Sequence, residues 1–201
     1  ILYIFLVFRM ENYKLLFTIA AVILTVAGYV PYLKDTFAGK TKPHVFSWFI
    51  WGILTAIIFA LQLSAGAGFG SYVTLALAIL SFFICAKSFR EGDKHIKKID
   101  VVFLVFALAA IPLWLVIKQP VLSMALLSAI DMLAFIPTIR KSWHDPYSET
   151  LSFFVITIFR HGLSIIALAE YNLVTYLFPL TWVFANGLFA LMLIIRRKYK
   201  E

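Results

Sequence analysis

The 201-residue chain has a single cysteine and few charged residues, and each shortage narrows the class of protein. One cysteine, Cys85, excludes an intramolecular disulfide, and its apolar neighbours favour a small packed side chain over a reactive thiol. Charged residues make up 14% of the chain and hydrophobic residues 63%. An average soluble domain is about 25% charged, and at this length its core cannot bury so much apolar surface. The composition therefore predicts a polytopic membrane protein.

The motifs of common enzymes and metal sites are also missing. There is no nucleophile elbow, no His-Glu-x-x-His pair and no glycine-rich phosphate loop. The histidines expected in loops show no ligand spacing with cysteine or carboxylate. We therefore expect no catalytic residue, no metal site and no cofactor. The net charge of +8 would suit nucleic acid, but it is distributed as in membrane proteins, so no nucleic-acid partner is expected.

Seven apolar stretches are long enough to span a bilayer, which takes about 20 residues. They cover residues 15–33, 45–63, 71–89, 101–117, 121–139, 151–169 and 173–195. Backbone groups find no water in hydrocarbon, and the sequence lacks the alternation of a barrel strand. The prediction is an all-α membrane protein with seven transmembrane helices.

Basic residues predict the orientation. Lysine and arginine gather after the first, third and fifth stretches and in the tail, whereas the opposite side carries only Arg9, Lys14 and Lys118. The positive-inside rule then places the N-terminus outside and the C-terminus in the cytoplasm. Compact loops favour a bacterial inner membrane, where the basic loop 94–98 would meet anionic lipid headgroups.

A repeated pattern divides the chain into two halves. An apolar stretch ends at Pro31 in one half and at Pro137 in the other, and the following stretch opens at Ser47 and at Ser152. Offsets of about 106 and about 105 residues indicate an internal duplication. Two three-helix units of equal orientation need one crossing helix between them, a 3+1+3 plan. The expected divisions are an extension at 1–14, a bundle at 15–90, a basic loop and connecting helix at 91–118, a bundle at 119–197 and a basic tail at 198–201.

These features resemble the PQ-loop superfamily, with its SWEET and SemiSWEET transporters. The resemblance covers nearly the whole chain, and the polar bend at 148–152, which contains Glu149, looks like the family's entry into the second helix of a unit. It implies helix order 1-3-2 in each bundle, alternating access around a central site, and hinges at Pro31 and Pro137. The chain departs from the pattern at Tyr32 and Thr138, where the family has glutamine after the proline.

Ionisable residues at membrane depth are the strongest site candidates, since they are costly there and usually face a bundle interior. Asp131 and Arg160 each lie about ten residues into a stretch, which is near the middle of the bilayer. The repeat pairs Asp131 with Thr25 and Arg160 with Thr55. Three roles stay open for the charged residues: a structural salt bridge, contact with solute, and proton exchange at Asp131.

Other polar and aromatic residues could have either a structural role or a role in the site. His161 either joins the charged cluster or is a hydrogen-bonded structural histidine. Asn186 and Trp182 could line the seam between bundles, where an amide and a ring suit a polyhydroxylated or zwitterionic solute. Asn186 could equally bond to a neighbouring helix. Trp48 and Trp51 are expected to be anchors at the membrane interface.

The sequence therefore predicts an integral membrane transporter of a small polar solute, sugar-like, amino acid or similar, that works by alternating access. Protons are a candidate co-substrate. The alternative is a non-transporting receptor or scaffold on the same fold. Homo-oligomerisation is compatible with the sequence, which does not specify an oligomeric state.

Overall fold

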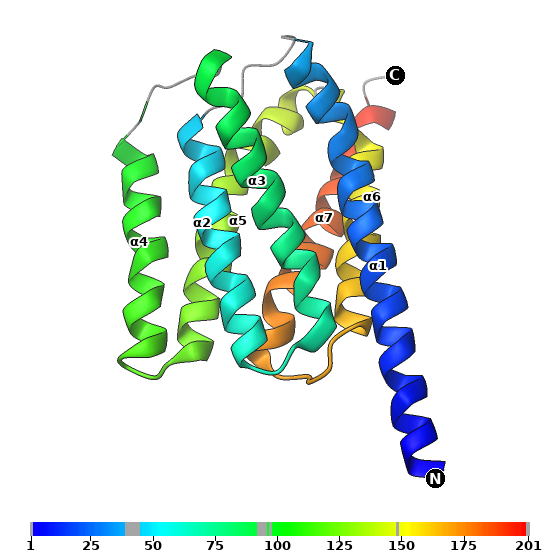
Figure 1. Ribbon diagram of the computed structural model, residues 1–201. Helices are drawn as coiled ribbons and strands as arrows, with labels where there is room; N and C mark the ends of the chain where they lie inside the picture. Colours follow the sequence, from blue (N-terminus) through cyan, green and yellow to red (C-terminus); the bar gives the residue numbers. More distant parts are fainter. Residues whose placement is uncertain (1, 39–44, 92–95, 97, 148, 200–201) are drawn as a thin grey trace.

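The computed structural model describes residues 2–38, 45–91, 96, 98–147 and 149–199. Within these residues the chain forms seven α-helices, one short 3-10 helix and no strand (Figure 1). The helices are α1 (Leu2–Phe37), α2 (Val45–Ser64), η1 (Gly68–Ser71), α3 (Tyr72–Glu91), α4 (Lys98–Leu115), α5 (Pro120–His144), α6 (Leu151–Ile166) and α7 (Leu173–Lys198). The predicted all-α fold is confirmed. The expected lipid-facing loop 94–98 falls largely outside the described residues.

Four helical segments are long and apolar enough to cross a membrane: Asn12–Pro31, Val45–Ser64, Gly68–Phe89 and Leu173–Lys198. Three shorter apolar segments follow the same pattern: Val101–Leu115, Pro120–Ile136 and Leu151–Ile166. Large apolar side chains also cover the outer surface, and Leu16, Val105 and Leu188 are each at least 60% exposed. Such a surface suits lipid rather than water, so the fold is compatible with a multi-pass membrane protein.

Neither proline predicted to end an apolar stretch ends its helix. Pro31 lies inside α1, which continues to Phe37, and α5 continues past position 137 to His144. A proline in a helix removes one backbone hydrogen bond, and a helix tolerates this where neighbouring helices support it. The side chain of Pro137 lies outside the described residues.

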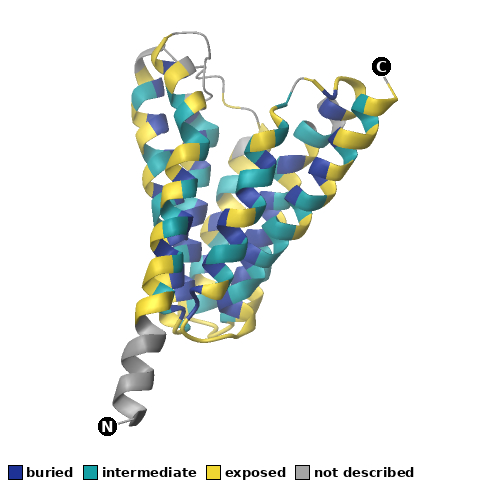
Figure 2. Cartoon of the chain, turned by 90° about the vertical axis from the view of Figure 1, so that its right-hand side faces the viewer, coloured by how far each residue is buried: buried dark blue, intermediate teal, exposed yellow. Residues whose placement is uncertain are grey.

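For reference, we name six of the helices as two groups of three. In the first group (α1, α2, α3), α3 contacts both α1 and α2, and in the second group (α5, α6, α7), α7 contacts both α5 and α6. The groups meet where α1 packs along α6, while α4 lies against α5 and α2. Figure 2 shows two arms of helices that meet at the end where α1 begins and diverge toward the end where α7 finishes.

Candidate functional site

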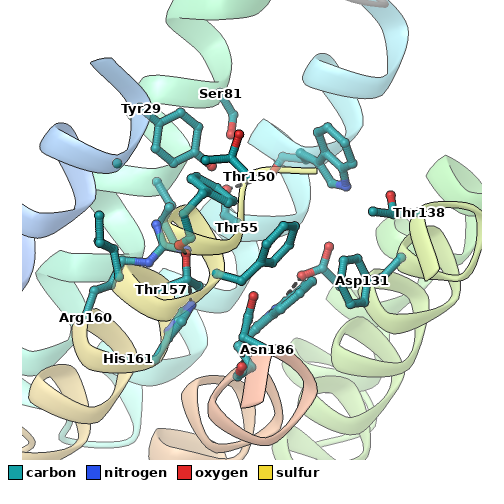
Figure 3. Close-up of a pocket in the computed structure, with 18 of the residues that line it drawn as sticks. Tyr29, Thr55, Ser81, Asp131, Thr138, Thr150, Thr157, Arg160, His161 and Asn186 are labelled. Carbon is teal, nitrogen blue, oxygen red and sulfur yellow. Dashed lines mark hydrogen bonds between the residues drawn. The ribbon is translucent and has the colours of Figure 1, made fainter. Parts of the chain in front are cut away.

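A cavity of about 540 Å³ lies between the two groups of helices. All six helices of the two groups line it, as does the loop that joins α5 to α6 (Figure 3). Its polar lining residues are Tyr29, Thr55, Ser81, Asp131, Thr138, Glu149, Thr150, Ser152, Thr157, Arg160, His161 and Asn186. A cavity of this size matches the sites that hold small molecules.

Asp131 is held by α7. Its side chain is 8% exposed, and its Oδ2 accepts a 2.8 Å hydrogen bond from the indole Nε1 of Trp182. Among the interactions of the described residues, Asp131 and Arg160 form no ion pair with one another. The salt bridge considered from the sequence is therefore not formed, because α7 lies between the helices that carry the two charges.

Arg160 is 6% exposed and only partly satisfied. Its Nη2 lies 3.2 Å from Nε2 of His161, and because a guanidinium only donates, that imidazole nitrogen is the acceptor. The guanidinium also interacts electrostatically with the Tyr29 hydroxyl. Its Nε is buried and has no partner. A buried donor without a partner costs about 1–3 kcal/mol or more when charged, so this N–H is a ready contact for a ligand.

Thr55, Thr157 and Asn186 line the cavity but direct a donor to their own helices. Thr55 and Thr157 donate to backbone carbonyls one turn back, at 2.6 and 2.9 Å. The Asn186 amide nitrogen donates to the Trp182 carbonyl at 2.6 Å, so its side-chain oxygen remains as an acceptor. Thr25 is 1% exposed, bonds to Ala21 and is not among the cavity-lining residues. Thr25 therefore lies outside this cavity, and its place in the pathway stays a prediction.

Aromatic rings form much of the remaining wall. Phe135 packs against Trp182 with ring centroids 5.4 Å apart, and Tyr29 packs edge-on against Trp48 at 6.2 Å. Trp48 is only 9% exposed, and both it and Trp51 line the cavity. Trp48 is therefore nearly buried at the cavity wall, which does not fit the expected role of an interface anchor, whereas that role of Trp51 stays a prediction.

Sequence reasoning missed several lining residues, Tyr29 and Thr157 among them. A signal for part of this wall is present in α6, where Thr157, Arg160, His161 and Ser164 recur at helical spacing and are all buried. Such a polar stripe on an otherwise apolar helix predicts a face turned toward other helices or a cavity.

The repeat-motif residues separate in space. Pro31, Glu149 and Ser152 line the main cavity. Ser47 instead lines a second, mainly apolar cavity between α2, α4 and α5. The first three mark the end of the main cavity nearest to where α2 and α6 begin.

At the opposite end, two loops form backbone hydrogen bonds across the groups. The Ala169 N–H donates to the Ala67 carbonyl at 2.9 Å, and the Glu170 N–H donates to the Gly66 carbonyl at 3.1 Å. These bonds join the loop after α2 to the loop after α6. We call this the closed end.

Side chains reinforce the closed end. The Gln62 amide donates to the Thr175 carbonyl at 2.9 Å, and the Asn172 amide donates to the Ala65 carbonyl at 2.9 Å. Asn172 also caps α7, accepting from the backbone N–H groups of Val174 and Thr175. One asparagine thus begins α7 and ties it to the first group.

Glycine is required at the closed end by the closeness of the two loops. Gly68 has φ +58°, in the left-handed region that favours glycine. A Cβ on Gly70 would lie 2.9 Å from the Leu168 nitrogen and 2.9 Å from the Ser164 carbonyl oxygen. The glycines at positions 66, 68 and 70 therefore form a contact surface for the second group.

The other end of the helices is basic. Its described cations include Lys34, Lys87, Arg196, Arg197 and Lys198. Arg197 donates to the Pro146 and Glu149 carbonyls at 3.0 and 2.7 Å and so fastens the α5–α6 loop to α7. We call this the basic end.

Comparison of the chain with protein-family models, with curated proteins and with solved structures finds no match. The class of protein therefore follows from fold and site alone. The described chain is an all-helical protein compatible with a membrane, with a polar cavity lined by α1, α2, α3, α5, α6 and α7.

Proposed function

We propose that this protein is a membrane transporter that carries a small polar solute by alternating access. The observation that carries the proposal is the cavity. It contains ionisable groups halfway along the helices, its lining reaches toward the basic end, and hydrogen bonds between the two groups block the other end. Buried charged groups at this depth are costly and are typical of solute or ion pathways.

The two groups are proposed to be repeats of one three-helix unit, joined by α4 in the 3+1+3 plan. The contacts support this, since the third helix of each group packs between the other two. This is also the 1-3-2 order implied by the resemblance to the PQ-loop and SWEET transporters. With the basic end in the cytoplasm, the N-terminus lies outside and the cavity faces the cytoplasm.

Transport then requires the closed end to open. The hydrogen bonds from Gln62, Ala169, Glu170 and Asn172 all run between the groups. Rocking one group against the other breaks them together while the helices within each group keep their packing. The small, glycine-rich loop lets the two groups meet closely and part again.

A reversible cross-link at the closed end tests this proposal. A Cβ at position 66 would lie 3.3 Å from the Glu170 Cβ, near the 3.5–4.5 Å typical of disulfides. The variant is Gly66→Cys with Glu170→Cys in a Cys85→Ala background, which removes the only native thiol. The single variants Gly66→Cys and Glu170→Cys control for strain at the positive φ of position 66.

The variants are assayed in proteoliposomes with labelled glucose, serine, leucine and uridine. We expect uptake of at least one solute above empty liposomes, its loss on oxidation of the double variant alone, and its return on reduction. Uptake unchanged by the cross-link would contradict alternating access at this end. Solute binding without uptake would favour the receptor or scaffold instead. An imposed pH gradient separates proton coupling from facilitated diffusion.

A further inference from the structure

We infer that the solute is a zwitterion whose anionic group binds at Arg160 and whose cationic group binds at Asp131. This inference rests on the proposed function only to the extent that both concern the same cavity. Figure 3 shows the two residues on opposite sides of the labelled cluster, with Arg160 on α6 and Asp131 on α5. Both side chains line the one cavity, and they make no ion pair with each other.

Arg160 has an unused N–H donor that can bind an anion. Its Nε is buried without a partner. The two groups next to its guanidinium are uncharged: the His161 nitrogen that faces it accepts a hydrogen bond, and Tyr29 offers a hydroxyl. A carboxylate can bind a guanidinium at two donors at once, and no other cation among the described lining residues competes for it.

Asp131 likewise makes no ion pair among the described residues. The Trp182 indole is a neutral donor that orients the carboxyl group through Oδ2 and brings no positive charge to it. A carboxylate has room for about four hydrogen bonds, and among the described residues this one accepts a single bond, from Trp182. Glu149, the other acid of the lining, lies nearer the basic end and already has a partner.

Aromatic rings favour the cationic group on the Asp131 side. Trp182 and Phe135 both line the cavity there, and their ring centroids are 5.4 Å apart. An ammonium that binds Asp131 over the face of either ring is attracted by that ring as well as by the carboxylate. The Arg160 side offers no such acid.

Only a solute that carries both a negative and a positive charge can pair with both Arg160 and Asp131. A simple anion pairs with Arg160 but leaves Asp131 buried and unpaired, and a simple cation does the reverse. A neutral sugar hydrogen-bonds to both but neutralises neither. Leaving a buried charge unpaired is strongly unfavourable, so each of these solutes is disfavoured relative to a zwitterion.

The test is a binding series on the wild-type protein in nanodiscs, measured by isothermal titration calorimetry. The zwitterions are leucine and the linear amino acids from glycine to 6-aminohexanoate, which place the two charges at increasing separation. Each is compared with the amine and the carboxylic acid of equal chain length, and with glucose. We expect the best zwitterion to bind at least about 10-fold more tightly than either matched analogue or glucose.

Two variants assign the ends of the solute. Arg160→Gln should lose the advantage of the zwitterion over its amine analogue, and Asp131→Asn should lose its advantage over the acid analogue. Lys198→Gln removes an exposed charge that does not line the cavity and should leave all ratios unchanged. The wild-type series decides the inference even if a cavity variant fails to fold.

The inference is overturned if no zwitterion binds more tightly than its singly charged analogues. Failure of the carrier proposal gives a different result. A sugar that is transported and blocked by the 66–170 cross-link would preserve the carrier and end the zwitterion assignment. A zwitterion that binds selectively without being transported would preserve the assignment and end the carrier.

Discussion

Gln62 on α2 and Thr175 on α7 connect the two groups of helices through a 2.9 Å hydrogen bond from the glutamine amide to the threonine backbone carbonyl. The same glutamine accepts a 2.7 Å bond from the Thr74 hydroxyl on α3. Gln62 is 1% exposed, so both ends of its amide are satisfied by protein. One buried side chain thus joins three helices at the closed end.

Replacing Gln62 should weaken the closed end. Gln62→Leu leaves the Thr74 hydroxyl and the Thr175 carbonyl without this partner, and we expect a loss of about 1–3 kcal/mol in the free energy of unfolding. Ser64→Ala is the matched control, because that hydroxyl bonds only within its own helix, to Leu61. Denaturation in mild detergent measures both variants. Equal losses in the free energy of unfolding of the two variants would show that the hydrogen bond between the groups adds no more stability than a local one.

Gly70 and Gly162 form a second matched pair. A Cβ at position 70 meets backbone atoms of the second group at 2.9 Å, whereas a Cβ at position 162 meets nothing within 4 Å. Gly70→Ala should therefore force the two loops apart and destabilise the protein by about 1–3 kcal/mol. Gly162→Ala should be neutral or stabilise α6 by up to about 1 kcal/mol, since alanine favours helix. Thermal unfolding measures both, and a neutral Gly70→Ala would contradict the close approach.

Trp182→Phe tests the anchoring of Asp131. Phenylalanine keeps an aromatic ring in the wall but removes the indole N–H that holds Oδ2. A hydrogen bond to a charged group contributes about 1.5–3 kcal/mol, so we expect affinity for the best-binding zwitterion to fall about 10-fold or more. Trp114→Phe, in the core around α4, is the control and should bind normally. Titration calorimetry decides, and wild-type affinity in Trp182→Phe would remove the anchoring role.

Arg197 should control the order of the loop between α5 and α6. It donates to two loop carbonyls, and its guanidinium lies 5.0 Å from the Tyr147 ring centroid. Arg197→Gln should therefore increase the rate of proteolytic cleavage within residues 145–150 several-fold. Lys198→Gln, one residue further along α7, should cleave as the wild type does. Unchanged cleavage in Arg197→Gln would show that the loop is held by other contacts.

Composition and hydropathy alone determined that this chain is all-helical and compatible with a membrane. So many apolar residues can be accommodated only by a lipid-facing helical surface. The cost of burying charge also led from the sequence to Asp131 and Arg160, which do line one cavity. These conclusions depend only on the hydropathy and charge of the residues along the chain, which can be read directly from the sequence.

Only the tertiary structure decided how those residues are partnered. That Trp182 rather than Arg160 binds Asp131 follows from α7 lying between α5 and α6, which hydropathy does not encode. The inward position of Trp48 and the pairing of Gly66 with Glu170 likewise depend on how the two groups meet. An apolar helix can turn any of several faces to its neighbours at similar cost in lipid. The choice among those faces is made by packing between segments far apart in the chain.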